Sequence, residues 1–402
     1  MPVGQQQSPL EAVARRFRWM TRIESPDAPG LAFYGAEVHP ADFGLSGYGR
    51  TASLSGKGLA DAQAFAGCAG EGVEHLSRLE WGTEQLVRST AKQAAHGLDD
   101  ATLQEILRLA GCDAAPAAEL DWMTATRLSD GAVVQVPAIL CLRRAGGIAS
   151  IPSAISTGCA AGPSLPVATL AGLLEAVERD AVALWWTGGR RGTAIGLDTL
   201  ARTGAVEALR QLRRDSETRT TWLLDLTADT DIPCVAALSV AAADGRGFAC
   251  GTAARLDVGE AIAAALLELC QSELGHRLVA AKRRARGDAA LNETDRRKLD
   301  RAAHLDAAAC ELLHPFGVPG QRAAADAQDA ACAVRFVVER LQHLSVEPLL
   351  VDLTRPVLGV PVVRIIAPGL QPFPSSLVTD RLMRLAAQSD ARTARPVGMT
   401  LF

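Results

Sequence analysis

The stretch "STGCAAGPSLPVATLAGLLEAVERD" at residues 156–180 combines three features that recur elsewhere in this chain. It begins with small residues and glycines, continues into a segment with helical spacing, and ends in an E-x-x-E pair formed by Glu175 and Glu178. Because three residues span nearly one helical turn, both carboxylates lie on one face of the predicted helix. Like charges at that spacing repel each other unless a cation lies between them.

Two other segments follow the same pattern, "SGKGLADAQAFAGCAGEGVEH" at 55–75 and "ACGTAARLDVGEAIAAALLELCQSE" at 249–273. Their acidic or amide positions are Glu71, Glu74, Glu268 and Gln271. An alanine stands seven residues before the first acid in every copy, at Ala64, Ala168 and Ala261. A single E-x-x-E pair is usually a solvated helix face. Three matched copies with small residues between the helices instead predict that the pairs converge on one cleft.

Five carboxylates and a glutamine cannot share one cleft without cations, because desolvated like charges would become protonated. Oxygen ligands of this kind suit Mg²⁺, which usually shares carboxylates with phosphates and water. The glycines ahead of each helix fit phosphate binding, and Lys57 and Arg179 are cations available to phosphates. The pattern therefore predicts a magnesium nucleotide. Neither a Walker motif nor the kinase motifs occur in the sequence.

Composition predicts a soluble, cytoplasmic, globular protein. The 402 residues are 48% hydrophobic, and the formal net charge of −4 gives no general reason to expect nucleic acid or a membrane as partner. A basic stretch at 280–287 is the local exception. The N-terminus lacks the apolar segment of a signal peptide, and no run approaches 18 apolar residues.

Cysteine and histidine usage argues against a disulfide frame or a zinc site. The nine cysteines include no C-x-x-C pair, and the seven histidines are dispersed. We expect reduced, buried thiols, while a cysteine nucleophile stays open as an alternative. His75 is interpreted as a helix-surface or supporting residue, and the sequence identifies no catalytic residue.

Apolar runs rich in Val, Ile and Leu predict strands at 31–38, 132–142, 220–227, 232–241, 347–354 and 360–369. They alternate irregularly with Ala/Leu-rich helical segments, which favours a mixed α/β or α+β domain. A second repeat pairs Asp225-Leu226-Thr227 with Asp352-Leu353-Thr354, each followed by a proline-led strand, and predicts two equivalent strand-turn-strand units. We expect an N-terminal extension (1–20), one catalytic domain (21–385) with a helical peripheral segment (282–335), and a C-terminal tail (386–402).

The three acidic segments resemble those of the YcaO family, over roughly residues 20–385. Gly56-Lys57-Gly58, the glycine-rich turn from Ser156, and the paired positions described above match the motifs of the family. The resemblance implies a YcaO-like α+β fold with internal strand-helix repeats, whose helices converge on a cleft that binds ATP and Mg²⁺. It assigns nucleotide binding to Lys57, Glu71, Glu74, Ser156, Glu175, Glu178, Arg179, Glu268 and Gln271. The implied metal ligands are Glu74, Glu175, Glu178 and Glu268.

Three positions depart from the family pattern. Gly67 stands where serine is usual, His75 stands where arginine is usual, and Glu273 stands where arginine often follows the glutamine. The inferred metal ligands are retained, but the residues that contact the phosphates are not assigned by the resemblance. Azoline-forming members commonly end in P-x-P-x-P, whereas this sequence ends "ARPVGMTLF", with Pro396 alone.

The resemblance implies ATP-dependent phosphorylation of a backbone amide oxygen in a ribosomally made peptide or protein. A nucleophile adds to the carbonyl, the oxyanion takes the γ-phosphoryl group, and phosphate leaves. Sulfide as nucleophile gives a thioamide, a substrate Cys, Ser or Thr gives an azoline, and an amine gives an amidine.

The residues 71–84 are similar to those of members that work with the partner protein TfuA, which favours thioamide formation. Azoline formation and a non-catalytic accessory role in ribosomal-protein modification stay open. The resemblance also implies a partner protein, TfuA-like or leader-peptide-binding, and allows a homodimer.

Overall fold

The fold is given by a computed structural model that describes residues 8–94, 96–113, 118–145, 156–317, 328–388 and 401. In this part of the chain the strands form three sheets, and every pair within them is antiparallel. The first sheet contains β1 (Trp19–Arg22), β2 (Ala32–Val38) and β3 (Ala52–Gly58), in that order. The second contains β10 (Ala249–Ala254), β9 (Cys234–Ala241) and β8 (Arg219–Asp225). The third contains β4 (Val87–Thr90), β5 (Glu119–Arg127), β11 (Leu349–Asp352), β12 (Val362–Ile366) and β7 (Cys159–Ala161), with β6 (Val133–Pro137) paired to β5.

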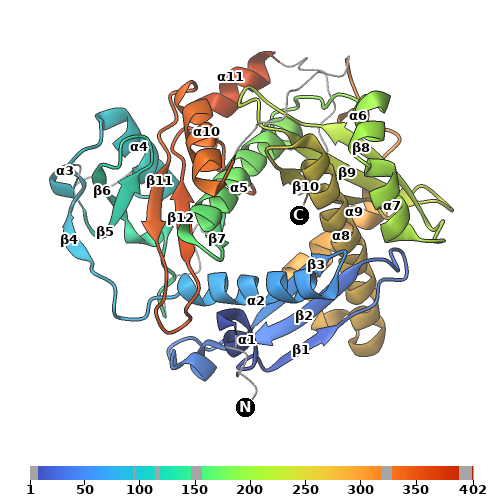
Figure 1. The fold of residues 1–402 in the computed structure, drawn as a ribbon, viewed down its shortest axis with the longest axis horizontal. Coiled ribbons are helices and arrows are strands. Elements are labelled where there is room, and N and C mark those ends of the chain that lie inside the picture. The colour runs from blue at the N-terminus through green and yellow to red at the C-terminus, as the bar shows by residue number, and fades with distance from the viewer. Residues whose placement is uncertain are drawn as a thin grey trace.

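Helices cover these sheets and connect them (Figure 1). The three long ones are α2 (Asp61–Ser77), α5 (Leu165–Trp186) and α8 (Val258–Arg286). The others are α1 (Pro9–Ala14), α3 (Ala91–Ala94), α4 (Asp100–Leu109), α6 (Leu197–Arg202), α7 (Ala205–Arg213), α9 (Glu293–His304), α10 (Ala330–Gln342) and α11 (Asp380–Gln388). Helices and antiparallel sheets together make the mixed α+β fold that the sequence predicts.

The three acidic segments form three equivalent strand-helix units. In each unit a strand at the edge of its sheet leads directly into a long helix, giving β3-α2, β7-α5 and β10-α8. In Figure 1 the helices stand around the middle of the molecule, with α2 below, α5 above and α8 to the right. The internal strand-helix repeat predicted from the sequence is confirmed.

Glycines allow the backbone of each helix to lie directly against its strand. A Cβ atom at Gly56 would lie 2.0 Å from the carbonyl oxygen of Ala64, and one at Gly251 would lie 2.1 Å from the backbone nitrogen of Leu269. Neither position accepts a side chain without moving the helix. In the second unit Gly172 of α5 packs against Gly158, whose φ of 78° also favours glycine.

The helices bury their other faces in separate apolar clusters. Leu173, Val177 and Trp185 of α5 pack in one cluster. The same role is taken in α2 by Cys68, Val73 and Leu76, and in α8 by Ile262, Leu266 and Leu269. Apolar burial of this kind, at about 25 cal/mol per Å², fixes each helix independently of the polar face that it turns toward its neighbours.

The second repeat also folds as two equivalent units. Asp225 accepts a hydrogen bond from the backbone N–H of Thr227 (2.8 Å), and the hydroxyl of Thr227 accepts one from the backbone N–H of Cys234 (3.0 Å). In the second unit Asp352 accepts from the backbone N–H of Thr354 (2.8 Å), and the hydroxyl of Thr354 accepts from the backbone N–H of Val362 (3.1 Å). Each aspartate and threonine thus closes the turn between two paired strands, β8 with β9 and β11 with β12.

All six predicted strands are present, but three predictions are too long. The stretches 347–354 and 360–369 form strands only over Leu349–Asp352 and Val362–Ile366. The stretch 132–142 forms β6 only to Pro137 and continues as a 3₁₀ turn, Ala138–Leu140. Pro137 has no N–H to donate, so pairing ends there. The segment predicted as peripheral contains the end of α8, then α9 and the start of α10, while residues 318–327 fall outside the described part. Pro396 of the predicted tail lies outside it too.

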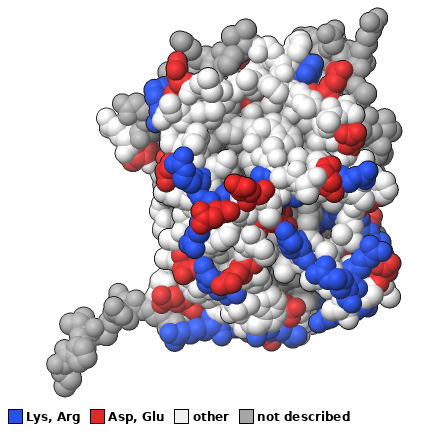
Figure 2. All heavy atoms as spheres, turned by 90° about the vertical axis from the view of Figure 1, so that its right-hand side faces the viewer, with Lys and Arg blue, Asp and Glu red and all other residues white. Residues whose placement is uncertain are grey.

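Charges of both signs mix on the face that carries α7 and α9 (Figure 2). Within the basic stretch 280–287, Lys282 pairs with Asp295 at 2.7 Å and Arg283 with Asp288 at 2.6 Å. These partners compensate two of the four cations of the stretch. Over the residues described, we find no helix that is both long and apolar enough to cross a membrane.

Candidate functional site

The three strand-helix units enclose one cavity of about 960 Å³. All nine residues predicted to bind nucleotide line it. They are Lys57, Glu71, Glu74, Ser156, Glu175, Glu178, Arg179, Glu268 and Gln271. The predicted convergence of three helices separated by about a hundred residues each is therefore present in the structure.

The first acid of the first and second units is bound by its own unit. Glu71 accepts hydrogen bonds from the backbone N–H and the hydroxyl of Ser55, at 2.7 and 3.2 Å. Glu175 accepts one from the N–H of Gly158 at 2.9 Å. In the third unit Glu268 instead forms an ion pair with Lys57 of β3, at 2.5 Å.

The second member of each pair reaches the strand of the next unit. Glu74 accepts a hydrogen bond from the backbone N–H of Ala161 in β7, at 2.8 Å. Glu178 accepts one from the hydroxyl of Thr252 in β10, at 2.7 Å. These two bonds join the first unit to the second and the second to the third.

Gln271 closes the circle. Its Nε2 donates to the hydroxyl of Ser55 in β3, at 3.2 Å, and so joins the third unit back to the first. We call this closed set of inter-unit bonds the acidic ring, formed by Glu74, Glu178 and Gln271 with their strand partners. Two of the partners are side chains on edge strands, Ser55 and Thr252, which the sequence analysis did not identify. Each stands next to the strand glycine of its unit, so position in the repeat could have identified both.

Burial raises the pKa values of the ring carboxylates. The pKa of Glu74 is raised to about 8 by burial, and nearby Glu175 and Glu71 add to that rise. Burial also raises the pKa of Glu178, against the opposing charge of Arg179. The guanidinium of Arg179 lies 3.5 Å from Glu175 and 3.4 Å from Glu178, so one cation serves two carboxylates. A divalent cation would favour the ionised form of these acids.

The donor set fits Mg²⁺ bound together with phosphate. Carboxylates come from all three helices, yet no three His, Cys, Asp or Glu side chains in the described ranges cluster tightly enough to hold a metal ion by themselves. Mg²⁺ is usually bound through one or two carboxylates, with phosphate and water completing its octahedral shell. In addition, Oε1 of Gln271 is buried and has no hydrogen-bond partner among the described residues. An unsatisfied buried oxygen at the ring marks a place where a ligand donor belongs.

The positions that depart from the family pattern differ in their placement. Glu273 lies outside the cavity and is fully buried in an ion pair with Arg213, at 2.5 Å. His75 is not among the described residues that line the cavity, and burial together with nearby Arg78 lowers its pKa to about 4. Gly67 does line the cavity, where it leaves room above β3.

Cys159 is the cysteine that lines the cavity among the described residues. Burial raises its pKa to about 12, so at neutral pH it is a protonated thiol. A thiol in this state is a poor nucleophile. The cysteine alternative therefore gains no support from this site.

A family model described as "YcaO cyclodehydratase, ATP-ad Mg2+-binding" matches residues 55–371, which include every member of the acidic ring. The chain belongs to the YcaO family. ATP and Mg²⁺ are the cofactors of this family, in agreement with the ligand predicted from the acidic pairs.

Individual proteins agree with this placement. An uncharacterized protein of Methanothermobacter thermautotrophicus is 29% identical over 367 residues, which cover 88% of this chain and 89% of that one. The structure of YcaO from Methanopyrus kandleri, bound with AMPPCP and Mg²⁺, aligns with a TM-score of 0.61 at 20% identity, over 90% of this chain and 88% of that one. A heterocyclase in complex with substrate and cofactor aligns with a TM-score of 0.70 at 24% identity, over 91% of this chain. The chain spans about half the length of that heterocyclase, 53%.

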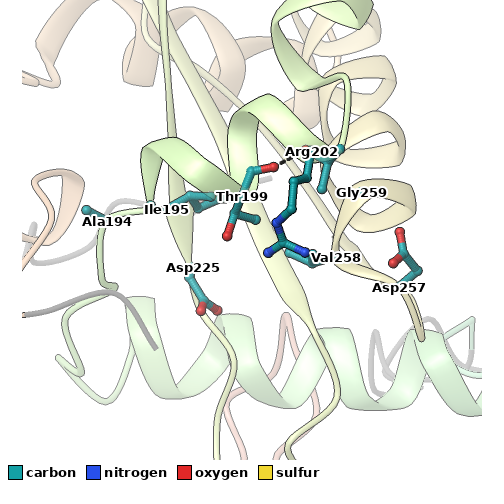
Figure 3. Close-up of a pocket in the computed structure, with 10 residues that line it drawn as sticks. Ala194, Ile195, Thr199, Arg202, Asp225, Asp257, Val258 and Gly259 are labelled. Carbon is teal, nitrogen blue, oxygen red and sulfur yellow. Dashed lines mark hydrogen bonds between the residues drawn. The ribbon is translucent and has the colours of Figure 1, made fainter. Parts of the chain in front are cut away.

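A second pocket of about 340 Å³ lies on the other side of the start of α8 (Figure 3). Thr199 and Arg202 of α6 face Asp225 and the first turn of α8 there. Its acids are used locally, because Asp225 accepts from the N–H of Thr227 and Asp257 accepts from that of Glu260. As far as the chain is described, none of the nine predicted residues lines this pocket.

Proposed function

We propose that the acidic ring binds Mg·ATP and that the enzyme uses it to activate a backbone amide of a peptide or protein. Glu74, Glu175, Glu178 and Glu268 are the proposed metal ligands, and Lys57 and Arg179 the proposed phosphate-binding cations. Ser156, Glu71 and Gln271 complete the nucleotide site. The observation that carries the proposal is the convergence of all nine residues on one cavity, closed by hydrogen bonds between the three units.

The chain's own residues would act mainly by position and charge. The helices are fixed by separate apolar clusters, so the carboxylates and cations are held before the ligands arrive. Bound ATP supplies the phosphoryl group that turns the amide oxygen into a leaving group, with Mg²⁺ offsetting phosphate charge. Lys57 and Arg179 line the cavity and would stabilise the negative charge of the transferring group.

The product that we propose is a thioamide, formed with an external sulfur donor and a partner protein. One observation supports it: residues 71–84 are similar to those of TfuA-associated members. The balanced reaction consumes hydrosulfide and ATP. The sulfur adds to the amide carbon, the C–O bond breaks with loss of the phosphorylated oxygen, and the proton on sulfur leaves as C=S forms, giving ADP and phosphate.

Azoline formation is the second candidate. It is supported by the likeness of the fold to the heterocyclase solved with substrate and cofactor. In that case a Cys, Ser or Thr side chain of the substrate takes the place of hydrosulfide, and water is lost overall.

Mass spectrometry separates the two products. Purified enzyme, Mg·ATP and sodium sulfide would be incubated with a set of unstructured peptides containing Cys, Ser and Thr, with and without a co-purified TfuA-like partner. A gain of about 16 Da reports oxygen replaced by sulfur, while a loss of about 18 Da reports ring closure. Peptide-dependent phosphate release without either change would contradict both products, and Mg·ATP binding without peptide-dependent release would favour an accessory role.

A further inference from the structure

The cations of the cavity fall into two classes. Among the described residues, Lys57, Arg78, Arg179 and Arg255 line it. Lys57 is paired with Glu268, and Arg179 is shared by Glu175 and Glu178. Arg78 and Arg255 form no ion pair with any carboxylate in the part of the chain that the structure describes. The repeat does not contain Arg78, so the sequence analysis did not identify it.

Arg78 follows the first unit's acidic pair by one helical turn. It caps the C-terminal end of α2, and its Nε lies 3.4 Å from the carbonyl oxygen of Glu74. Residues four apart share one face of a helix, so Arg78 extends the polar face of Glu74 along the cavity wall. Its side chain is half-buried. A partly desolvated guanidinium with no anion is costly, and an anionic ligand would relieve that cost.

The cavity lining shows at which joint Arg78 stands. Ser156 and Cys159, from the turn and the strand that enter the second unit, line the same cavity as Arg78. Glu74, one helical turn before Arg78, accepts its inter-unit hydrogen bond from Ala161 at the end of that strand, at 2.8 Å. Arg78 therefore stands at the joint between the first unit and the second.

Arg255 is a less suitable candidate for the same ligand. Its Nη1 donates to the carbonyl oxygen of Ala254, at 2.7 Å, so part of its fork is already used by its own backbone. It comes from the third unit, where Leu256 and Glu260 line the cavity with it. The side-chain bond of Arg78 comes from Nε instead, so among the described residues both of its Nη groups are left for a ligand.

We propose that Arg78 binds the phosphate chain of the nucleotide at the joint between the first and second units, opposite the turn at Ser156. The inference rests on the proposed Mg·ATP site and adds a specific contact to it. A guanidinium matches two phosphate oxygens at once, which a lysine ammonium cannot do. Arg78 would then discriminate between nucleotides by their phosphates and not by their base.

Isothermal titration calorimetry with Mg·ATP and Mg·ADP tests this inference. The variants are Arg78→Gln, Arg78→Lys and Arg255→Gln, with Arg202→Gln as the matched control because Arg202 is exposed and lines the other pocket. We expect Arg78→Gln to weaken binding of at least one of the two nucleotides by roughly 10- to 100-fold, the scale of a lost charge-assisted bidentate contact. Arg78→Lys should recover part of the loss, and Arg202→Gln should match the parent protein.

Several outcomes would overturn the assignment. Parent-like affinity of Arg78→Gln for both nucleotides would do so, and a loss seen in Arg255→Gln alone would place the phosphates at the third unit. Thermal unfolding of each variant separates lost binding from lost folding, and if Arg78→Gln is unfolded, parent-like affinity of Arg78→Lys counts against the bidentate contact. Absence of Mg·ATP binding by the parent protein would instead remove the proposed function itself.

Discussion

Helix α5 carries three acids within one and a half turns, and they differ in their partners. Glu175 and Glu178 face the cavity and share Arg179 at 3.4 to 3.5 Å. Asp180 turns into the core and is fully paired. Arg381 of α11 contacts both of its carboxylate oxygens, at 2.8 and 3.0 Å from Nε and 2.9 Å from Nη2, and Gln371 donates its N–H at 2.8 Å. Arg381 also binds Asp229, which lies after β8.

The contrast separates an acid that the chain itself pairs from acids that we propose bind a ligand. Asp180 obtains all of its partners from residues of the chain, and it joins α5 to α11 and to the β8–β9 turn. The acidic ring holds more negative than positive charge, keeps Glu74 with a pKa near 8, and leaves Oε1 of Gln271 without a partner in the described part of the chain. Burial raises the pKa of Asp180 as well, so burial alone does not identify function, and the incomplete compensation of charge at the ring is what supports the proposed site.

Breaking the structural pair should give the largest effect. Arg381→Met removes the partner of the buried Asp180 carboxylate, and loss of one member of such a pair costs about 3–5 kcal/mol of the free energy of unfolding. Urea denaturation measures it. The affinity of the folded protein for Mg·ATP should change far less than its stability. A destabilisation below about 1 kcal/mol would show that the Asp180 cluster is not the structural half of the comparison.

Neutralising the acids of the cavity should do the reverse. We expect Glu175→Gln and Glu178→Gln each to weaken Mg·ATP binding by roughly 100-fold, about 2.7 kcal/mol, because a metal ligand is lost. Stability without nucleotide should be unchanged or higher, since like charge is removed. Calorimetry and thermal unfolding measure the two quantities, with surface-exposed Glu207→Gln as control. Unchanged affinity in both variants would end the site assignment.

The pKa of Glu74 predicts a pH dependence. Near pH 6 to 7 this carboxyl is mostly protonated in the free site, so binding of Mg·ATP to the carboxylate must release a proton. Affinity should therefore rise with pH, by at most about tenfold per unit, and level off above pH 8. Without metal, the folded protein holds this proton more tightly than the unfolded chain does. The free energy of unfolding should therefore fall as the pH rises from the pKa of an unfolded glutamate, 4.5, toward 8. Calorimetry in buffers of different ionisation enthalpy measures the number of protons released when Mg·ATP binds. The variant Glu74→Gln should release no proton from this position.

The smallest effect should come from the neutral member of the ring. Gln271→Ala removes the bond to Ser55 that joins the third unit to the first, and a neutral hydrogen bond contributes about 1 kcal/mol, or roughly fivefold in affinity. Titration calorimetry resolves a change of this size. A loss as large as that of Glu178→Gln would mean that Gln271 does more than close the ring. It would then bind the ligand directly through Oε1, which has no hydrogen-bond partner among the described residues.

The sequence predicts the fold where strands are rich in Val, Ile and Leu, as in β9 and β12. It fails for β3, β7 and β10, because "ASLSGKG", "CAA" and "ACGTAA" are built of small residues with little preference for strands. Those residues are small because the helix backbone lies against them, as at Gly56 and Gly251. The feature that hides these strands from prediction is the one that brings the acidic helices together.

For the site, repetition made prediction possible. Glu71, Glu175 and Glu268 recur with the same spacing from an alanine, so their convergence could be predicted. Ser55 and Thr252 differ in residue type, and only their shared position, nine residues before that alanine, connects them. The pairing of Asp180 with Arg381, 201 positions apart, depends on tertiary packing that no local pattern encodes.

Titration of Mg·ATP against three single variants, one from each unit, tests the central claim most directly. If Glu74, Glu178 and Glu268 serve one site, then Glu74→Gln, Glu178→Gln and Glu268→Gln should each weaken binding strongly, and pairs of these changes should lose much less than the sum of their single effects. Parent-like affinity in any one variant, or losses that simply add, would contradict a shared magnesium nucleotide site formed by three helices.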